Sequence, residues 1–201
     1  MENIKISGAG TVVGGEYDEI SISGSGKIKG RTKCNTLKSS GSICCDETLE
    51  VNVLKTSGSA KFEGDLKVNE GKTSGSLLVE GTLEANKFEA SGGVVVKGDV
   101  NVDEFSAKIS KGTFENIYGD KICINSVGTF VVDLPVVVIE GKKEVKVENI
   151  EATTICIKDV KVDRVSGDVV CIEEGCVVNV VEYRKSLDIS SKAKIEMIIK
   201  L

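Results

Sequence analysis

The sequence predicts an all-β protein folded as a single parallel β-helix, a solenoid whose coils of about 17 residues stack on one another. Three observations predict this fold: a Ser-Gly dipeptide that returns at a constant spacing, apolar residues that align in columns at that spacing, and an unusual composition. The 201 residues include 22 glycines but only 4% aromatics, with no Trp or His and a single Pro. Many short strands joined by tight turns fit this composition better than helices do.

The repeat is clearest at the Ser-Gly dipeptide. It occurs at Ser7-Gly8, Ser23-Gly24, Ser40-Gly41, Ser57-Gly58, Ser74-Gly75 and Ser91-Gly92. Every spacing is the same except the first, which is one residue shorter. A fixed period of this size indicates that one coil cannot bury its own apolar face, so that stacking must bury it.

Apolar residues aligned at this period predict the coil interior, because side chains alternate in and out along a strand. Gly71 interrupts the longest column, which contains Ile4, Ile20, Leu37, Leu54, Phe88, Phe105, Ile122 and Ile139. The other columns are Ile43, Ala60, Leu77 and Val94, then Cys45, Phe62, Val79 and Val96, then Leu49, Leu66, Leu83, Val100 and Ile117.

Polar columns predict the corners of the coil. Stacked Asn side chains tolerate a sharp turn and can hydrogen-bond from coil to coil, as expected for Asn35, Asn52, Asn69 and Asn86, continued by Asp103 and Asp120. The glycine of each Ser-Gly predicts a second corner, where a positive φ costs nothing.

Charges on the outer wall favour parallel stacking in register, because opposite signs then face each other on neighbouring coils. Two columns alternate in this way: Glu50, Lys67 and Glu84, and Glu70, Lys87 and Glu104. A third column places three like charges together, Lys38, Lys55 and Lys72, which either splay apart in solvent or form an anion-binding stripe.

The period loosens after residue 122. The segments VKVENIEATTICIKD, VKVDRVSGDVVCIEEG and CVVNVVEYRKSLDISS still resemble one another, whereas GTFVVDLPVVVIEGKK around Pro135 fits poorly. We therefore expect one continuous solenoid over residues 1–201, regular over 1–122 and irregular over 123–201. The irregular coils should each contain roughly 15 to 17 residues, and the whole solenoid about a dozen coils.

The sequence contains no pattern that indicates an enzyme, a cofactor site or a metal site. Without His, neither a His-based acyl-transfer site nor a three-His zinc site can be built. Polysaccharide chemistry needs only carboxylates and a cation and stays an alternative, with the best cluster at Asp159, Asp163, Arg164 and Asp168. A balanced charge, with 26 basic and 31 acidic residues, gives no support for nucleic-acid binding.

The seven cysteines fit reduced thiols, since the chain shows no export signal and no CxxC pair. Cys34 and Cys45 share columns with apolar residues and should be buried. Cys44 and Cys123 fall in outward columns, so we expect them to be the exposed thiols.

The ends of the solenoid lack an obvious cap, such as an amphipathic helix. Each end would expose a strand edge and a section of the core, which favours contact between copies. We expect an end-to-end homo-oligomer or filament whose interface contains Ile4, Ile6, Ile195, Met197, Ile199 and Leu201. A fold-back of the last strand over the final coil would instead leave a monomeric interaction module.

The repeats ISGSGKIKGRTKC, TSGSAKFEGDLKV, TSGSLLVEGTLEA and ASGGVVVKGDVNV resemble those of bactofilins, bacterial polymer-forming cytoskeletal proteins. The resemblance covers residues 1 to about 122 well and is strongest to a longer bactofilin-like subgroup of Gram-positive bacteria. It implies a right-handed β-helix that polymerises without nucleotide and is a scaffold for client proteins at the membrane or cell wall.

The chain departs from the bactofilin pattern in its greater length and in its start, which has no tail with a membrane-targeting peptide. No apolar run has the length of a signal peptide or membrane span. We therefore expect a cytoplasmic protein that reaches the inner face of the membrane only through partners.

Overall fold

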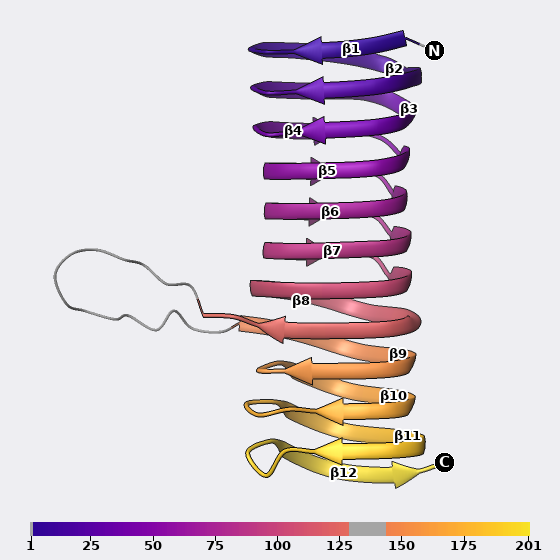
Figure 1. The fold of residues 1–201 in the computed structure, drawn as a ribbon, viewed down its shortest axis with the longest axis vertical. Helices are drawn as coiled ribbons and strands as arrows, with labels where there is room; N and C mark the ends of the chain where they lie inside the picture. The colour runs from indigo at the N-terminus through magenta and orange to yellow at the C-terminus, as the bar shows by residue number, and fades with distance from the viewer. Residues whose placement is uncertain (1, 129–143) are drawn as a thin grey trace, which may run out of the picture.

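The computed structural model describes residues 2–128 and 144–201, and within them it contains strands and connecting turns but no helix (Figure 1). Twelve parallel strands form one sheet in chain order, and the sheet coils into a rod with the N- and C-termini at opposite ends. The strands are β1 (Glu2–Ile6), β2 (Ala9–Ile22), β3 (Ser25–Ser39), β4 (Ser42–Cys45), β5 (Leu49–Phe62), β6 (Leu66–Val79), β7 (Leu83–Val96), β8 (Val100–Ser126), β9 (Glu144–Lys158), β10 (Lys161–Ile172), β11 (Val177–Ile189) and β12 (Lys194–Lys200).

The predicted all-β parallel solenoid is confirmed, with about 11 turns. In Figure 1 the strands nearest the viewer run leftward as the chain descends, so the coil is right-handed. The described residues contain no helix with the length and hydrophobicity that a membrane span requires.

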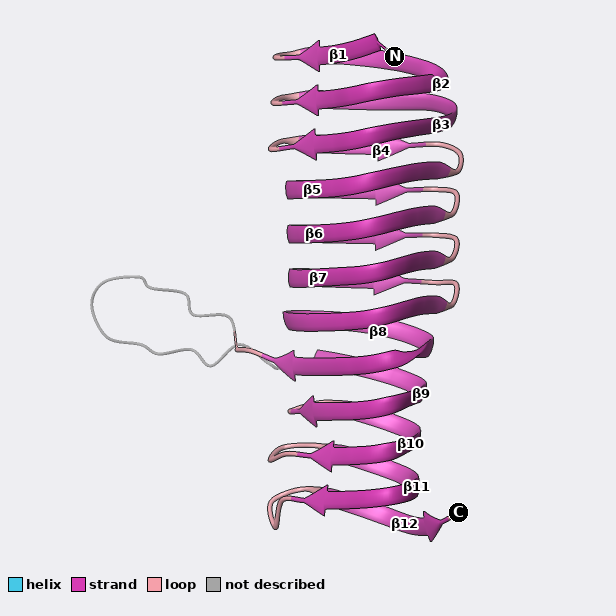
Figure 2. Ribbon diagram, turned by 45° about the vertical axis from the view of Figure 1, so that its right-hand side comes forward, coloured by secondary structure: helices cyan, strands magenta, loops and turns pink. Residues whose placement is uncertain are grey.

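The strand register follows the period read from the sequence. β5, β6 and β7 stack in step with the Ser-Gly repeat, so that Leu49 pairs with Leu66 and Leu66 with Leu83. Elsewhere paired residues on neighbouring coils are closer in sequence: the separation is one residue shorter between Ile4 and Ile20 and two shorter between Val147 and Val162. Figure 2 shows the connecting turns of successive coils lying above one another.

One step of the solenoid differs from the predicted period. β8 pairs with β9 at an offset of 33 residues, so that Ile122 lies beside Ile155. The expected neighbour, Ile139, and the segment around Pro135 lie outside the described residues. Among the described residues, the apolar column therefore continues from Ile122 to Ile155.

The core consists of the predicted apolar columns, whose side chains alternate with exposed ones along each strand. In β6 and β7 the interior positions are almost wholly buried, including Leu66, Leu77, Val79, Leu83, Phe88, Val94 and Val96. Three aromatic rings contact one another in the core, with centroids 6.3 Å apart for Phe88 and Phe105 and 5.9 Å for Phe105 and Phe114.

The Ser-Gly corners require glycine for a different reason from the one the sequence suggests. Gly58, Gly75 and Gly92 have the expected positive φ, but the other three, Gly8, Gly24 and Gly41, do not, which corrects the prediction for those three. At every one of these glycines except Gly8, a Cβ would overlap the carbonyl oxygen of the corner glycine one coil earlier. Close stacking of backbones is therefore what excludes a side chain at this corner.

The predicted Asn column forms a hydrogen-bonded ladder. Asn69 Nδ2 donates to Asn52 Oδ1 (2.9 Å), and Asn86 Nδ2 donates to Asn69 Oδ1 (2.6 Å). Asn35 Nδ2 donates to Asp18 Oδ1 instead (2.7 Å). A second ladder was not predicted: it joins Asp99, Asn116 and Asn149 at another corner of the coil.

Substitution of Asn69 by Ala should lower the free energy of unfolding by about 1 kcal/mol, because the change removes two cross-coil hydrogen bonds at a solvent-exposed corner. Denaturant unfolding followed by circular dichroism measures the loss. Asn101→Ala is the control, since the Asn101 side chain makes no hydrogen bond to the described residues. Equal losses for both variants would show that the ladder contributes nothing.

Candidate functional site

The two ends of the rod are the candidate site for self-association. β1 and β12 are the edge strands of the sheet, and each pairs with a strand on one side only. Their outer edges carry unpaired backbone N–H and C=O groups among the described residues. Such an edge is a template on which another strand can pair.

At the N-terminal end, Ile4 and Ile6 lie on interior columns, as predicted, and pack against the core while staying partly exposed. Val12 begins a third interior column in the same first coil, beside Ile28 of the second. The first coil therefore begins three apolar columns, of which those at Ile4 and Ile6 stay partly exposed while Val12 is buried.

At the C-terminal end, the register separates the four predicted residues. Ile195 pairs with Val178 and faces the interior, whereas Ile199 pairs with Glu182 on the outer wall. Met197 and Leu201 are exposed, at 54% and 56%.

Ile198 is the end residue that sequence reasoning missed. It continues the column of Val181, which is completely buried, yet its own side chain is 51% exposed because no coil covers it. The strict alternation assumed from the sequence fails here because a corner at Asn179 and Val180 shifts the inward positions by one. Leu187 and Ile189 close two further interior columns and were also missed.

The two end faces are apolar at matching positions. The column that starts at Ile4 ends at Leu187, and the column that starts at Ile6 ends at Ile189. The column that starts at Val12 ends at Ile195. A second copy stacked head to tail would therefore continue each column with an apolar neighbour.

A groove of about 870 Å³ runs along the side of the rod over the first seven coils. Its floor is the nearly buried column of Cys34, Val51, Val68, Ala85 and Val102. One rim is the Asn ladder, and the other is the charged column that contains Lys33, Glu50, Lys67 and Glu84.

On the charged rim of the groove, Glu50, Lys67 and Glu84 are all in cross-coil ion pairs. Lys67 Nζ lies 2.9 Å from Glu84 Oε2, and this hydrogen bond raises the pKa of the Lys67 ammonium. Arg31 pairs with Glu50 and lowers the pKa of that carboxyl.

The first and last of the three stacked lysines each form an ion pair with a glutamate. Lys38 pairs with Glu19 (3.0 Å) and Lys72 with Glu89 (2.9 Å), which leaves Lys55 between them without an ion pair to any described residue. This partial neutralisation disfavours the anion-binding stripe that the sequence left open.

The acidic cluster considered for polysaccharide chemistry is divided among separate cross-coil contacts. Asp163 Oδ1 accepts from Asn179 (3.0 Å), Arg164 pairs with Glu182 (2.6 Å), and Asp168 pairs with Lys185 (2.8 Å). These side chains therefore connect neighbouring coils at three different places.

Glu174 ties together three coils near the C-terminal end, because its carboxylate lies 3.0 Å from both Lys192 and Lys158. These two hydrogen bonds lower the pKa of Glu174 from 4.5 to about 2. A carboxyl whose pKa falls on folding stabilises the folded state above its unfolded pKa, and this contribution is lost as the pH falls through the folded pKa.

Glu174→Gln should therefore lower the free energy of unfolding at pH 7, and its difference from the unsubstituted chain should shrink between about pH 4.5 and about pH 2. Denaturant unfolding at a series of pH values tests this. Glu196→Gln is the control, because Glu196 forms no ion pair with the described residues. A difference that stays constant with pH would contradict the assignment.

Cys34 and Cys45 are buried, as predicted, and desolvation raises the pKa of the Cys34 thiol to about 12. Cys44 and Cys123, predicted to be exposed, are half-buried because the columns of neighbouring coils flank them. Cys156 and Cys171 lie in the same column as Cys123.

No protein-family model matches the chain, and neither a curated protein nor a solved structure matches it significantly.

Proposed function

We propose that this chain is a structural protein that assembles end to end into filaments without a nucleotide and acts as a scaffold. The main observation behind the proposal is that the apolar columns of the interior are not fully covered at either end of the rod. Ile4 and Ile6 at one end, and Ile195 and Ile198 at the other, occupy core positions without a further coil to bury them.

The magnitudes favour association. If each end offers about 400 Å² of apolar surface, contact between two ends gains on the order of 20 kcal/mol gross. Association costs roughly 4 to 15 kcal/mol in lost translational and rotational freedom. Pairing of the β1 and β12 edges would add backbone hydrogen bonds to this gain.

The sides of the rod would be the surfaces on which client proteins dock. Ion pairs between coils, such as Lys97 with Glu80, keep these walls polar along the rod. A filament would repeat each surface feature once per copy, so that clients, including membrane or cell-wall machinery, could be held in an array. Proteins of this kind need no catalytic residue.

Sedimentation velocity across a hundredfold range of protein concentration tests the proposal. Self-assembly predicts a weight-average sedimentation coefficient that rises with concentration and does not depend on added nucleotide. A constant value for a single elongated particle would replace the proposal with a monomeric interaction module.

The groove supports a second candidate, binding of an extended polysaccharide. Its Asn rim offers stacked carboxamides at regular intervals, and Tyr17 and Tyr118 also line it. Carboxamides and aromatic rings are suited to hydroxyl groups and sugar faces. A glycan array probed with the unsubstituted chain and with Asn69→Ala would decide it, since groove binding should weaken in the variant.

A further inference from the structure

Three cysteines lie beside one another on three consecutive coils. Cys123 on β8 pairs in register with Cys156 on β9, and Cys156 pairs with Cys171 on β10. All three side chains are half-buried on the outer wall, between the buried columns that flank them. Parallel strands in register hold such side chains about 4.8 Å apart, which brings thiols on adjacent coils close together.

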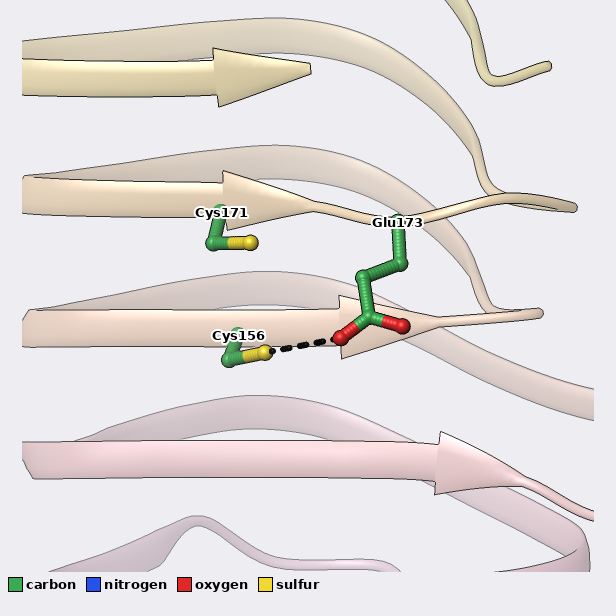
Figure 3. Close-up of side chains that lie close together, drawn as sticks. All are labelled: Cys156, Cys171 and Glu173. Atoms are coloured by element: carbon green, nitrogen blue, oxygen red, sulfur yellow. Dashed lines mark hydrogen bonds between the residues drawn. The ribbon is translucent and has the colours of Figure 1, made fainter. Parts of the chain in front are cut away.

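Together with the thiols of Cys156 and Cys171, Glu173 forms a group of three potential metal ligands. The Cys156 sulfur, the Cys171 sulfur and a Glu173 carboxylate oxygen all lie within 4.8 Å of one another. Figure 3 shows the three side chains converging from neighbouring coils, with the Cys156 thiol donating to Glu173 Oε1 at 3.6 Å.

The second Glu173 oxygen faces a different partner. Lys158 Nζ lies 3.8 Å from Oε2 of Glu173 and 3.0 Å from the Glu174 carboxylate. Glu174 is therefore the nearer partner of Lys158. Oε1 accepts from the Cys156 thiol and therefore faces the thiols, where it could bind an ion while Lys158 keeps its contacts.

We propose that Cys156, Cys171 and Glu173 bind one divalent cation of the borderline or soft class, such as Zn²⁺. A set of two thiolates and a carboxylate binds such ions in preference to Mg²⁺ or Ca²⁺. Around tetrahedral zinc with Zn–S bonds of about 2.3 Å, ligand atoms lie roughly 3.8 Å apart. Ligand binding would require side-chain rotations that bring the three atoms, now within 4.8 Å of one another, to that separation.

Three protein ligands leave one tetrahedral position for water or for a ligand from another molecule. The bound ion would join β9 to β10, because Cys156 comes from one coil and the other two ligands from the next. The site lies on the side wall of the rod, so it does not depend on the proposed end-to-end assembly.

Titration of the reduced full-length chain with Zn²⁺, in competition with a chromophoric chelator, tests the site. One equivalent should bind tightly, and Cys156→Ser or Cys171→Ser should each weaken binding at least about 100-fold, since loss of a direct ligand exceeds the effect of an outer-shell change. Glu173→Gln keeps the shape and both thiols and should weaken binding by at least about 10-fold.

Cys44→Ser and Cys123→Ser are matched controls and should bind as the unsubstituted chain does. Co²⁺ in place of Zn²⁺ should produce a thiolate-to-metal charge-transfer band that Cys171→Ser diminishes. The proposal is overturned if the unsubstituted chain binds no more Zn²⁺ than Cys156→Ser/Cys171→Ser, if Glu173→Gln binds equally well, or if only Cys123→Ser abolishes binding.

Discussion

Ile198→Asp should prevent filament formation while leaving the β-solenoid folded. The side chain continues the buried column of Val181 but is 51% exposed in the single chain, so a carboxylate there stays hydrated until a second copy covers it. Burial of an unpaired charge costs several kcal/mol, which should raise the concentration needed for assembly at least about 100-fold. Sedimentation measures the shift, and circular dichroism reports whether the fold survives.

Val169→Asp is the matched control. Val169 is 37% exposed on β10, which has strands on both sides, so the same change there places the charge on the side of the rod. Assembly should be unchanged. Equal loss of assembly in both variants, or none in Ile198→Asp, would remove the C-terminal face from the contact.

The opposite end gives a second test of the same contact. Ile4→Asp should also block growth, since Ile4 is an apolar column head on the N-terminal face. Head-to-tail stacking predicts that a mixture of Ile4→Asp and Ile198→Asp forms dimers and stops, because each variant keeps one intact face. Continued growth of the mixture would contradict head-to-tail contact.

Gly71→Leu should destabilise the chain although it restores the repeat. One coil earlier the same position holds Leu54, and pattern alone favours an apolar side chain. A Cβ on Gly71 would overlap the ring of Phe88 on the next coil, which fills the space that a Leu would take. Overpacking of this kind costs about 1 to 3 kcal/mol.

Denaturant unfolding of Gly71→Leu, Phe88→Leu and the double variant measures the coupling between the two positions. The double variant should be more stable than the sum of the single changes predicts, because each change makes room for the other. Gly93→Ala should have little effect, since a Cβ there meets no atom within 4 Å. Additive losses would contradict the packing of Phe88 over Gly71.

The regular half of the solenoid could be predicted because each coil repeats the same constraints. The Ser-Gly corners, where glycine backbones stack closely, and the Asn ladder both fix the register of one coil on the next. These local signals agree with the apolar columns, so the coil boundaries follow from the sequence.

The later coils could be predicted only in outline, because their spacing varies. An offset of 33 residues separates Asn116 on β8 from Asn149 on β9, and the next step, from β9 to β10, is less than half as long. The column of Cys123, Cys156 and Cys171 therefore has no constant period.

The signal that could have found this column was the recurring apolar-Cys-Ile triplet at Ile122, Ile155 and Val170. Ile198 was not predicted as an interior residue for a related reason. A corner inside the coil shifts the alternation of inward-facing residues along the strand. Where spacing and alternation both change, residues cannot be assigned to columns by counting along the sequence.

Electron microscopy of the negatively stained, unsubstituted chain, at several concentrations and salt levels and without nucleotide, shows directly whether the chain forms filaments. End-to-end assembly predicts filaments one solenoid wide that lengthen as the concentration rises. Single short rods at every concentration would contradict end-to-end assembly and leave a solenoid that functions alone.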